Sequence, residues 1–210
     1  MFKNRIEAGL FLTAKLKKYK NDHSVILAVP RGGVPVAYTV AKELDFPMEI
    51  ILTKKIGHPL NKEYAIGAAS LTDYFVLPHK DVTEEYIQSE LKRIRIRLKE
   101  MQKKFMGNKE PEILTDKTVI IVDDGMATGN TILNSVNVIR KSKPKKIVVA
   151  VPVASPDAIK KLAVEVDEVI TVFAPATFYG VGAFYDHFME VNDDEVLFYL
   201  DKIHKLSPTN

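Results

Sequence analysis

Short runs of apolar residues recur along the chain and alternate with longer stretches of helical periodicity. The runs lack the apolar–polar alternation of half-exposed strands, which is typical of strands buried on both faces of a parallel sheet. They lie at residues 25–29, 48–53, 119–122, 147–153 and 169–173, and helical patterns follow at 34–44, 132–141 and 157–164. This order predicts an α/β fold, a parallel doubly wound sheet with right-handed crossovers.

The segments between and around these units predict covering elements. Residues 5–19 have one apolar face opposite several lysines, so we expect an amphipathic helix that packs on the core. Residues 82–106 have a long helical pattern with acidic residues early and basic residues late, although the alternation over 93–98 also fits a strand. We further expect a loop at 56–61, a hairpin of 63–70 with 74–77, and a closing helix at 192–205.

The length of 210 residues suits one α/β domain with a small appendage. We expect a single domain over residues 1–210, with a core at about 24–174. A small hood would be built from about residues 1–20 and 175–210. The sequence contains no detectable repeats.

The composition excludes several classes of function. The 46% of hydrophobic and 27% of charged residues are ordinary for a globular protein, and a formal charge of +3 is too small to indicate nucleic acid binding. The absence of cysteine excludes disulfides, thiolate catalysis and cysteine zinc sites. No apolar run approaches the ~20 residues of a membrane span. The first residues lead into an amphipathic helix rather than an apolar leader, so we expect a cytoplasmic protein.

The candidate functional residues are concentrated at 119–131, where a predicted buried strand is followed by two adjacent carboxylates, Asp123 and Asp124. A turn of small residues follows, and a helix is predicted to begin near Thr131. The free N–H groups of such a helix end suit a phosphate monoester, and the acidic pair suits sugar hydroxyls, a metal ion or both. A solvated Asp-Asp-Gly turn is the simpler alternative. It explains the continuation poorly, which reads Ala127, Thr128, Gly129, Asn130 and Thr131.

A second strand–turn–helix unit contains Arg31, Gly32 and Gly33 after the strand at 25–29. An arginine and two glycines at a turn are as compatible with mere chain punctuation as with anion binding. Lys54 and Lys55 are predicted to end the next strand, where they would meet an anion. Two solvated lysines before a loop are an equally good interpretation of that pair.

The segment 175–188 is rich in aromatic residues and contains two glycines. Most of its rings are expected to form a small core that attaches the tail to the domain. Aromatic faces beside flexible backbone can also stack a planar heterocycle. Phe178 and Tyr179 are our candidates for that contact because they follow closely on the last predicted strand.

The stretch 119–131 resembles the phosphoribosyl pyrophosphate (PRPP) motif of the type I phosphoribosyltransferases: an apolar strand, two acidic residues and a turn that ends in Thr-Gly-x-Thr. About nine-tenths of the chain resembles a group of bacterial and archaeal members with no assigned acceptor. These share Pro-Arg-Gly-Gly-Val-Pro-Val and a late Phe-Tyr-x-Val-Gly segment. Ala127 stands where the 6-oxopurine enzymes have an aspartate, which argues against a hypoxanthine–guanine reaction.

The resemblance implies a PRPP- and Mg²⁺-dependent transferase that releases pyrophosphate. Asp123, Asp124 and Arg31 would be catalytic, and the two aspartates would also hold the metal. Residues 127–131 would bind the 5-phosphate. The pyrophosphate would be bound by Arg31, Gly32, Gly33, Lys54 and Lys55. Phe178 and Tyr179 would contact the base.

The family also has a flexible closing loop, which would fall at about residues 99–110 here, and often a cis peptide in the turn at 31–33. The expected partners are PRPP and a nucleobase-like acceptor, with a homodimer possible. The rival interpretation is a non-catalytic regulatory protein that binds PRPP or a nucleotide and uses the face around Arg93–Arg97 for a partner or an RNA.

Overall fold

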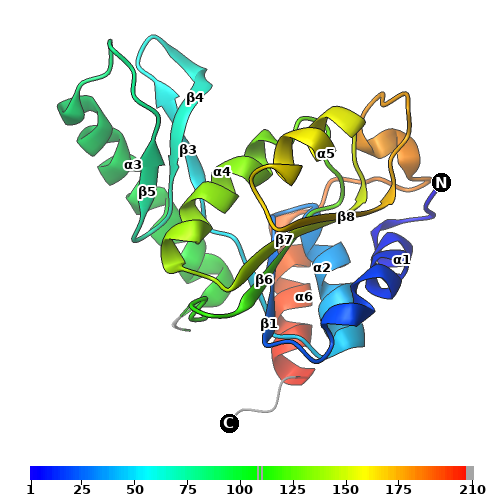
Figure 1. Ribbon diagram of the computed structural model, residues 1–210. Helices are drawn as coiled ribbons and strands as arrows, with labels where there is room; N and C mark the ends of the chain where they lie inside the picture. Colours follow the sequence, from blue (N-terminus) through cyan, green and yellow to red (C-terminus); the bar gives the residue numbers. More distant parts are fainter. Residues whose placement is uncertain (108, 110, 207–210) are drawn as a thin grey trace.

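The computed structural model describes residues 1–107, 109 and 111–206 (Figure 1). The strands are β1 (Ser24–Ala28), β2 (Met48–Ile50), β3 (Lys54–His58), β4 (Asn61–Ala69), β5 (Tyr74–Val76), β6 (Thr118–Val122), β7 (Lys146–Val153) and β8 (Glu168–Phe173). The α-helices are α1 (Arg5–Leu16), α2 (Gly33–Leu44), α3 (Glu84–Met106), α4 (Asn130–Ile139), α5 (Pro156–Ala163) and α6 (Asp193–Leu206). Short 3₁₀ turns lie at Lys17–Tyr19, Arg140–Ser142 and Val181–Phe184.

The main sheet has five parallel strands in the order β2-β1-β6-β7-β8, which confirms the predicted fold class. Central strands β1 and β6 pair from Ser24 opposite Thr118 to Ala28 opposite Val122, and every residue of both is buried. The chain leaves β1 toward β2 on one side and returns to β6 on the other. Ligands of open α/β sheets bind at such a reversal, outside the carboxyl ends of the strands.

Helices cover both faces of this sheet (Figure 1). Successive strand residues point to opposite faces, so Ile120 and Val122 lie in one core cluster and Val119 and Ile121 in the other. Helices α1, α2 and α6 pack on the first face, and α4 and α5 pack on the second. The all-apolar strands of the sequence are explained by this double coverage.

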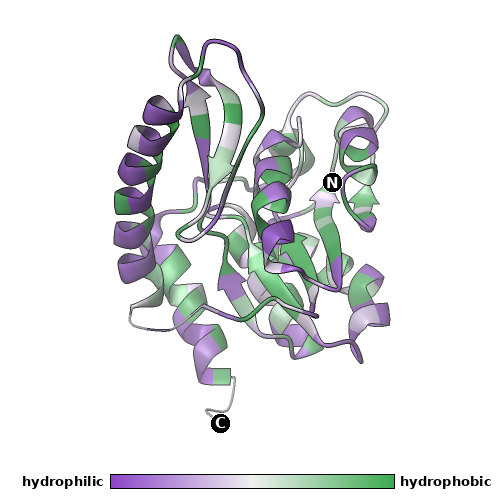
Figure 2. Cartoon of the chain, turned by 60° about the vertical axis from the view of Figure 1, so that its left-hand side comes forward, coloured by the Kyte–Doolittle hydropathy of each residue, from purple (hydrophilic) through white to green (hydrophobic). Residues whose placement is uncertain are grey.

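A second, antiparallel sheet, β3-β4-β5, stands beside the main one with α3 along it (Figures 1 and 2). Ile56 and Ile66 pack against Leu91, Ile94 and Leu98 of α3, while the outer side of the helix is polar. The predicted hairpin of residues 63–70 with 74–77 is confirmed by the pairing of β4 with β5.

Two predictions at the entry to this sheet are wrong. The strand expected over 48–53 ends at Ile50, and much of the loop expected at 56–61 belongs to β3. Lys54 and Lys55 therefore begin β3 instead of ending the preceding strand. Burial of Ile56 against α3 overrides the loop-forming glycine and proline nearby, because strand formation follows packing more than local propensity.

The prediction of a flexible loop at about residues 99–110 is also wrong over most of that range. Residues 99–106 are the last turns of α3, and Phe105 there is buried. The helix ends at Met106 and is capped by Gly107, whose φ of 61° lies in a region that glycine tolerates. Asn108 and Glu110 lie outside the described residues.

The first residues of the chain meet the segment around residues 184–186, which precedes α6. The N–H of Phe2 donates to the carbonyl of Phe184 at 2.8 Å, and the N–H of Asp186 donates to the carbonyl of Phe2 at 2.8 Å. Helices α1 and α6 themselves lie against α2 in the layer on the sheet. Of the segments that we assigned to a hood, the first residues and the stretch before α6 are the parts that approach the acidic turn. In the part of the chain that the structure describes, no helix is both long and apolar enough to cross a membrane.

Candidate active site

The turns after β1 and β6 lie side by side at the switch point of the main sheet. Val29 donates its N–H to the carbonyl of Val122 at 2.8 Å, and Gly33 donates to the carbonyl of Val29 at 3.0 Å. The peptide bond between Pro30 and Arg31 is cis, one residue before the turn positions at which we expected such a bond. These contacts bring the arginine–glycine turn against the acidic pair, as the predicted topology required.

The two aspartates differ in their surroundings. Oδ2 of Asp124 accepts a hydrogen bond from Nε of Arg5 at 2.9 Å and forms an ion pair with Nη2 at 2.8 Å. Asp123 accepts the backbone N–H of Asp124 at 2.8 Å and has no ion pair with a basic side chain among the described residues. Burial, together with the charge of Asp124, raises the pKa of Asp123 well above its usual range. Burial also raises the pKa of Asp124, and Arg5 opposes that shift.

Arg5 and Tyr185 are site residues that the sequence analysis missed. Arg5 also donates to the carbonyl of Met189 at 2.8 Å and lies over the ring of Phe188, 3.9 Å from its centroid. Tyr185 donates its hydroxyl to the backbone carbonyl of Asp124 at 2.6 Å, and burial raises its pKa. No local motif marks Arg5, since it starts an ordinary amphipathic helix. Tyr185 lay in the aromatic segment that the sequence singled out.

A hollow of about 540 Å³ opens over this pair of turns. Arg5, Arg31, Gly32, Asp123 and Asp124 line it together with residues 188–191. The structure thus brings the predicted Arg31, Gly32, Asp123 and Asp124 into one place. Arg31 pairs at its edge with Glu190 at 3.1 Å and Asp193 at 3.3 Å, contacts that an incoming anion would have to replace.

The turn that follows leads into α4. Gly129 caps the helix in the left-handed conformation, with φ 71°, and Thr128, Asn130 and Thr131 are exposed around it. Ala127 and Thr128 line a second hollow, of about 670 Å³, which Phe178 and Tyr179 also line. Phe178 also packs on Phe184, as expected of a small tail core, whereas Tyr179 is 87% exposed.

Lys54 and Lys55 lie in a third hollow, of about 720 Å³, which Thr131 also lines. This hollow shares no residue with the one that contains Arg31 and Gly32. The two lysines and the arginine–glycine turn thus line different hollows. Their contact with the same pyrophosphate stays a prediction.

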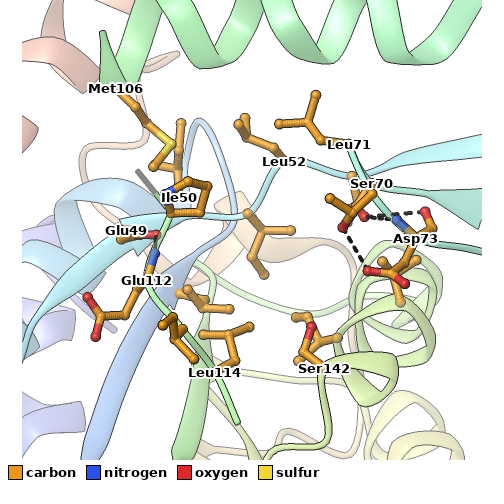
Figure 3. A pocket seen from close by; sticks show the side chains of 18 of the residues that line it. Glu49, Ile50, Leu52, Ser70, Leu71, Asp73, Met106, Glu112, Leu114 and Ser142 are labelled. Carbon is orange, nitrogen blue, oxygen red and sulfur yellow. Dashed lines mark hydrogen bonds between the residues drawn. The ribbon is translucent and has the colours of Figure 1, made fainter. Parts of the chain in front are cut away.

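A fourth hollow, of about 390 Å³, has mostly apolar walls beside β2 and contains none of the predicted site residues (Figure 3). Glu49 is buried in its wall. Its Oε2 accepts the N–H of Glu112 at 3.0 Å, while Lys109 Nζ lies 3.8 Å from Oε1, too far for a hydrogen bond. Within the described residues, Oε1 has no hydrogen-bond partner, and burial raises the pKa of Glu49.

The buried Glu49 makes stability fall as pH rises. Its folded pKa is raised above the unfolded value, so the folded state binds the proton more strongly, and stability is lost as pH rises through the folded pKa. We expect Glu49→Gln to raise the free energy of unfolding at pH 7 by on the order of 1 kcal/mol, with little effect at pH 4. Urea denaturation at both pH values measures this, with the exposed Glu43→Gln as control. A loss of stability at pH 7 would contradict it.

The ion pair of Arg5 with Asp124 is nearly buried, with 11% and 13% of the two side chains exposed. Arg5→Ala leaves the carboxylate in place without its partner, so we expect a loss of about 3 kcal/mol in the free energy of unfolding. Urea denaturation measures it, and Lys15→Ala, an exposed change on the same helix, should have almost no effect. Equal stability of the two variants would show that the fold tolerates the Asp124 carboxylate without its ion pair to Arg5.

The donor set fits a metal that arrives with a substrate. Asp123 and Asp124 supply hard carboxylate oxygens, and Mg²⁺ is often held by one or two carboxylates plus substrate phosphates and water. Among the described residues, no group of three or more His, Asp or Glu gathers into a metal cage. The residues therefore suit a shared Mg²⁺ better than a resident one.

Comparisons with known proteins place the chain in a family. A family profile described as "Phosphoribosyl transferase domain" matches residues 4–180. Over 98% of its length the chain is 35% identical to proteins named "Putative phosphoribosyl transferase" from two Mycobacterium tuberculosis strains, CDC 1551 and H37Rv, and it spans about half (47%) of their length. The crystal structure of TT1426 from Thermus thermophilus is 33% identical, with a TM-score of 0.88 over 96% of this chain and 98% of that one.

Proposed function

Since the chain belongs to the phosphoribosyl transferase domain family, we propose that it transfers the 5-phosphoribosyl group of PRPP to a nitrogenous base and releases pyrophosphate. The observation that supports this best is the single hollow lined by Asp123, Asp124, Arg31 and Gly32 at the switch point of the sheet. It offers carboxylates for a sugar and a cation for an anionic leaving group in the same place.

The different surroundings of the two aspartates suggest different roles. Asp123, which has no basic partner among the described side chains, would accept the ribose hydroxyls. Asp124, held by Arg5 and through its carbonyl by Tyr185, would fix the turn and share the metal. When bound, Mg²⁺ would neutralise part of the charge on the pyrophosphate of PRPP.

The other groups of PRPP have candidate positions around the same turn. The amides of residues 127–131, at the turn that leads into α4, would bind the 5-phosphate, since helix N-termini attract anions. Arg31 and the amides of Gly32 and Gly33 would take the pyrophosphate. Phe178 and Tyr179, which line the second hollow together with Ala127, would stack the base.

The reaction would depend on positioning and electrostatics. A nitrogen lone pair of the base attacks C1 of the ribose, and the bond from C1 to the pyrophosphate oxygen breaks with its electrons on the leaving group. Arg31 would stabilise the charge that develops on that group, and the aspartates the positive character of the sugar ring. No covalent enzyme intermediate is required.

Pyrophosphate release from PRPP and Mg²⁺ in the presence of a panel of nucleobases tests the proposal. We expect release that depends on one base or a small class of bases. Release without any base would indicate a hydrolase. Binding of PRPP in titration calorimetry without release for any base would indicate the regulatory binding protein, the alternative that the strong ion pairing of Asp124 leaves open.

A further inference from the structure

The fourth hollow, beside β2, contains none of the residues to which the proposed reaction assigns a role. We call it the β2 hollow. It is enclosed by β2 and the residues after it, the turn between β4 and β5, the end of α3, residues 111–115 and the end of α4 (Figure 3). Its volume of about 390 Å³ is in the range of small-molecule sites. Its residues are Leu27, Glu49, Ile50, Ile51, Leu52, Thr53, Ser70, Leu71, Thr72, Asp73, Met106, Pro111, Glu112, Ile113, Leu114, Thr115, Val138, Ile139 and Ser142.

Glu49 occupies a position of the sheet where an apolar side chain would be expected. It pairs with Leu27 of β1, and its neighbours Met48 and Ile50 pack in the core on the face of α1, α2 and α6. Because successive strand residues point to opposite faces, the side chain of Glu49 lies on the other face, where Leu27 also packs. Only 7% of this side chain is exposed. A carboxyl group buried at such a position is costly unless it finds a partner.

The hydrogen-bonding capacity of Glu49 is only partly used. Oε2 accepts the N–H of Glu112 at 3.0 Å. Within the described part of the chain, Oε1 has no hydrogen-bond partner, and Nζ of Lys109 lies 3.8 Å away from it. The Lys109 side chain is 46% exposed, so it is free to move aside. A donor that reaches Oε1 in these apolar surroundings would gain more than it does in water.

The charged residues that line the β2 hollow are all acidic. They are Glu49, Asp73 and Glu112, and no lysine, arginine or histidine lines it among the residues that the structure describes. Glu112 pairs with Lys117, whereas Asp73 has no ion pair within residues 1–107, 109 and 111–206. Figure 3 shows Glu49 and Asp73 on different sides of the hollow, with apolar side chains between them. Charge of one sign between apolar walls attracts a ligand of the opposite sign.

We propose that the β2 hollow binds an organic amine, whose ammonium group donates to Oε1 of Glu49 and whose apolar body contacts Leu52, Leu71 and Leu114. The ammonium group supplies the donor that the carboxyl group lacks, in a charge-assisted hydrogen bond. The aliphatic walls remove the apolar body from water. The β2 hollow shares no residue with the hollow of Asp123, so the inference does not depend on transferase activity.

Binding of 2-phenylethylamine tests the inference, with 2-phenylethanol and phenylacetate as neutral and anionic probes of similar shape. In titration calorimetry at pH 7 and constant ionic strength, we expect the amine to bind. The alcohol and the acid should bind at least about tenfold more weakly, the value of one charge-assisted hydrogen bond. Ethylamine keeps the ammonium group but lacks the ring, so it should also bind more weakly than 2-phenylethylamine.

Glu49→Gln tests the assignment of the ammonium contact. The amide keeps the size of the side chain and removes its charge, and we expect this variant to fold because the same change should stabilise the protein at pH 7. The Kd for 2-phenylethylamine should rise about tenfold. The matched control is Glu43→Gln, the same change at an exposed position of α2, which should alter the Kd less than about twofold.

Three results would overturn the inference. The first is no binding of 2-phenylethylamine at millimolar concentration. The second is the same Kd in the Glu49→Gln and Glu43→Gln proteins, which would place the amine elsewhere on the molecule. The third is binding of phenylacetate or 2-phenylethanol as tight as that of the amine, which would assign the hollow to an acid or to a neutral apolar molecule. The base panel for the transferase reaction uses none of these probes, so either proposal can fail without the other.

Discussion

We expect the Asp123→Asn protein to release pyrophosphate from PRPP about a hundredfold more slowly than the native protein at saturating acceptor. The amide keeps the shape of the side chain but removes the charge that would face the oxocarbenium-like sugar. Electrostatic groups aimed at developing charge typically contribute ~3 kcal/mol to transition-state stabilisation. The control is Asp201→Asn, which makes the same chemical change at an exposed position of α6 outside the hollow. This variant should retain full activity.

We expect the same variant to keep its stability although it loses activity. Burial raises the pKa of Asp123, which means that the charged form is poorly solvated in the folded state. Asp123→Asn is therefore expected to keep or raise the free energy of unfolding in urea. A variant that loses activity because it unfolds would show both falling together. Native activity in a folded Asp123→Asn protein would exclude this residue from the reaction.

Asp124→Asn separates the two roles that we assign to the pair. Its side chain is held by Arg5, so the amide leaves the guanidinium without its carboxylate. We expect this variant to lose stability as well as activity, unlike Asp123→Asn. The comparison shows whether Asp124 acts on the substrate or mainly through the position of the turn.

The main sheet could be predicted because the sequence pattern of each of its strands is local. The strands of residues 119–122 and 147–153 are apolar on both faces, and in a chain with helices between such runs this pattern is typical of a covered parallel sheet. Gly32, Asp123 and Asp124 could be placed together from topology alone, since carboxyl ends of neighbouring parallel strands share one edge.

The small sheet and the ion pair of Arg5 could not be predicted in the same way. Strand β3 depends on burial of Ile56 against α3, a helix that begins 28 residues later in the sequence. Arg5 meets Asp124 across 119 residues, and the local sequence around Arg5 does not distinguish it from a solvated charge. The place of Lys54 and Lys55 along the chain was mispredicted for the first of these reasons, because β2 ends at Ile50 and the two lysines begin β3.

Substitutions of the adjacent Gly32 and Gly33 test how closely the turns after β1 and β6 must approach each other. A Cβ on Gly33 would lie 2.7 Å from the carbonyl oxygen of Val122 and 2.8 Å from the Cα of Asp123, both of which are backbone atoms of the central strand or its end. A Cβ on Gly32 would lie 2.2 Å from Oδ2 of Asp124, the end of a side chain. Backbone in a central strand cannot shift alone, whereas a side chain can rotate away.

We therefore expect Gly33→Ala to lower the free energy of unfolding by about 3 kcal/mol, at the upper end of overpacking costs. Gly32→Ala should cost less stability, because its φ of −58° is compatible with alanine and the clash is with the Asp124 carboxylate. It should still reduce pyrophosphate release strongly, since the carboxylate must leave its position between Arg5 and the hollow. Urea denaturation and the base-panel assay on both variants measure the two effects.

A double-mutant cycle locates the clash at Gly32. If the added methyl group acts by displacing the Asp124 carboxylate, Gly32→Ala should cost little further stability in an Asp124→Ala background, so the two changes should be non-additive. Strict additivity would mean that the methyl group acts on something other than that carboxylate. Native stability in Gly33→Ala would show that the two turns are further apart than 2.7 Å implies. The hollow would then lose the close approach that places Arg31 beside the acidic pair, and with it the main support for a site that binds sugar and pyrophosphate together.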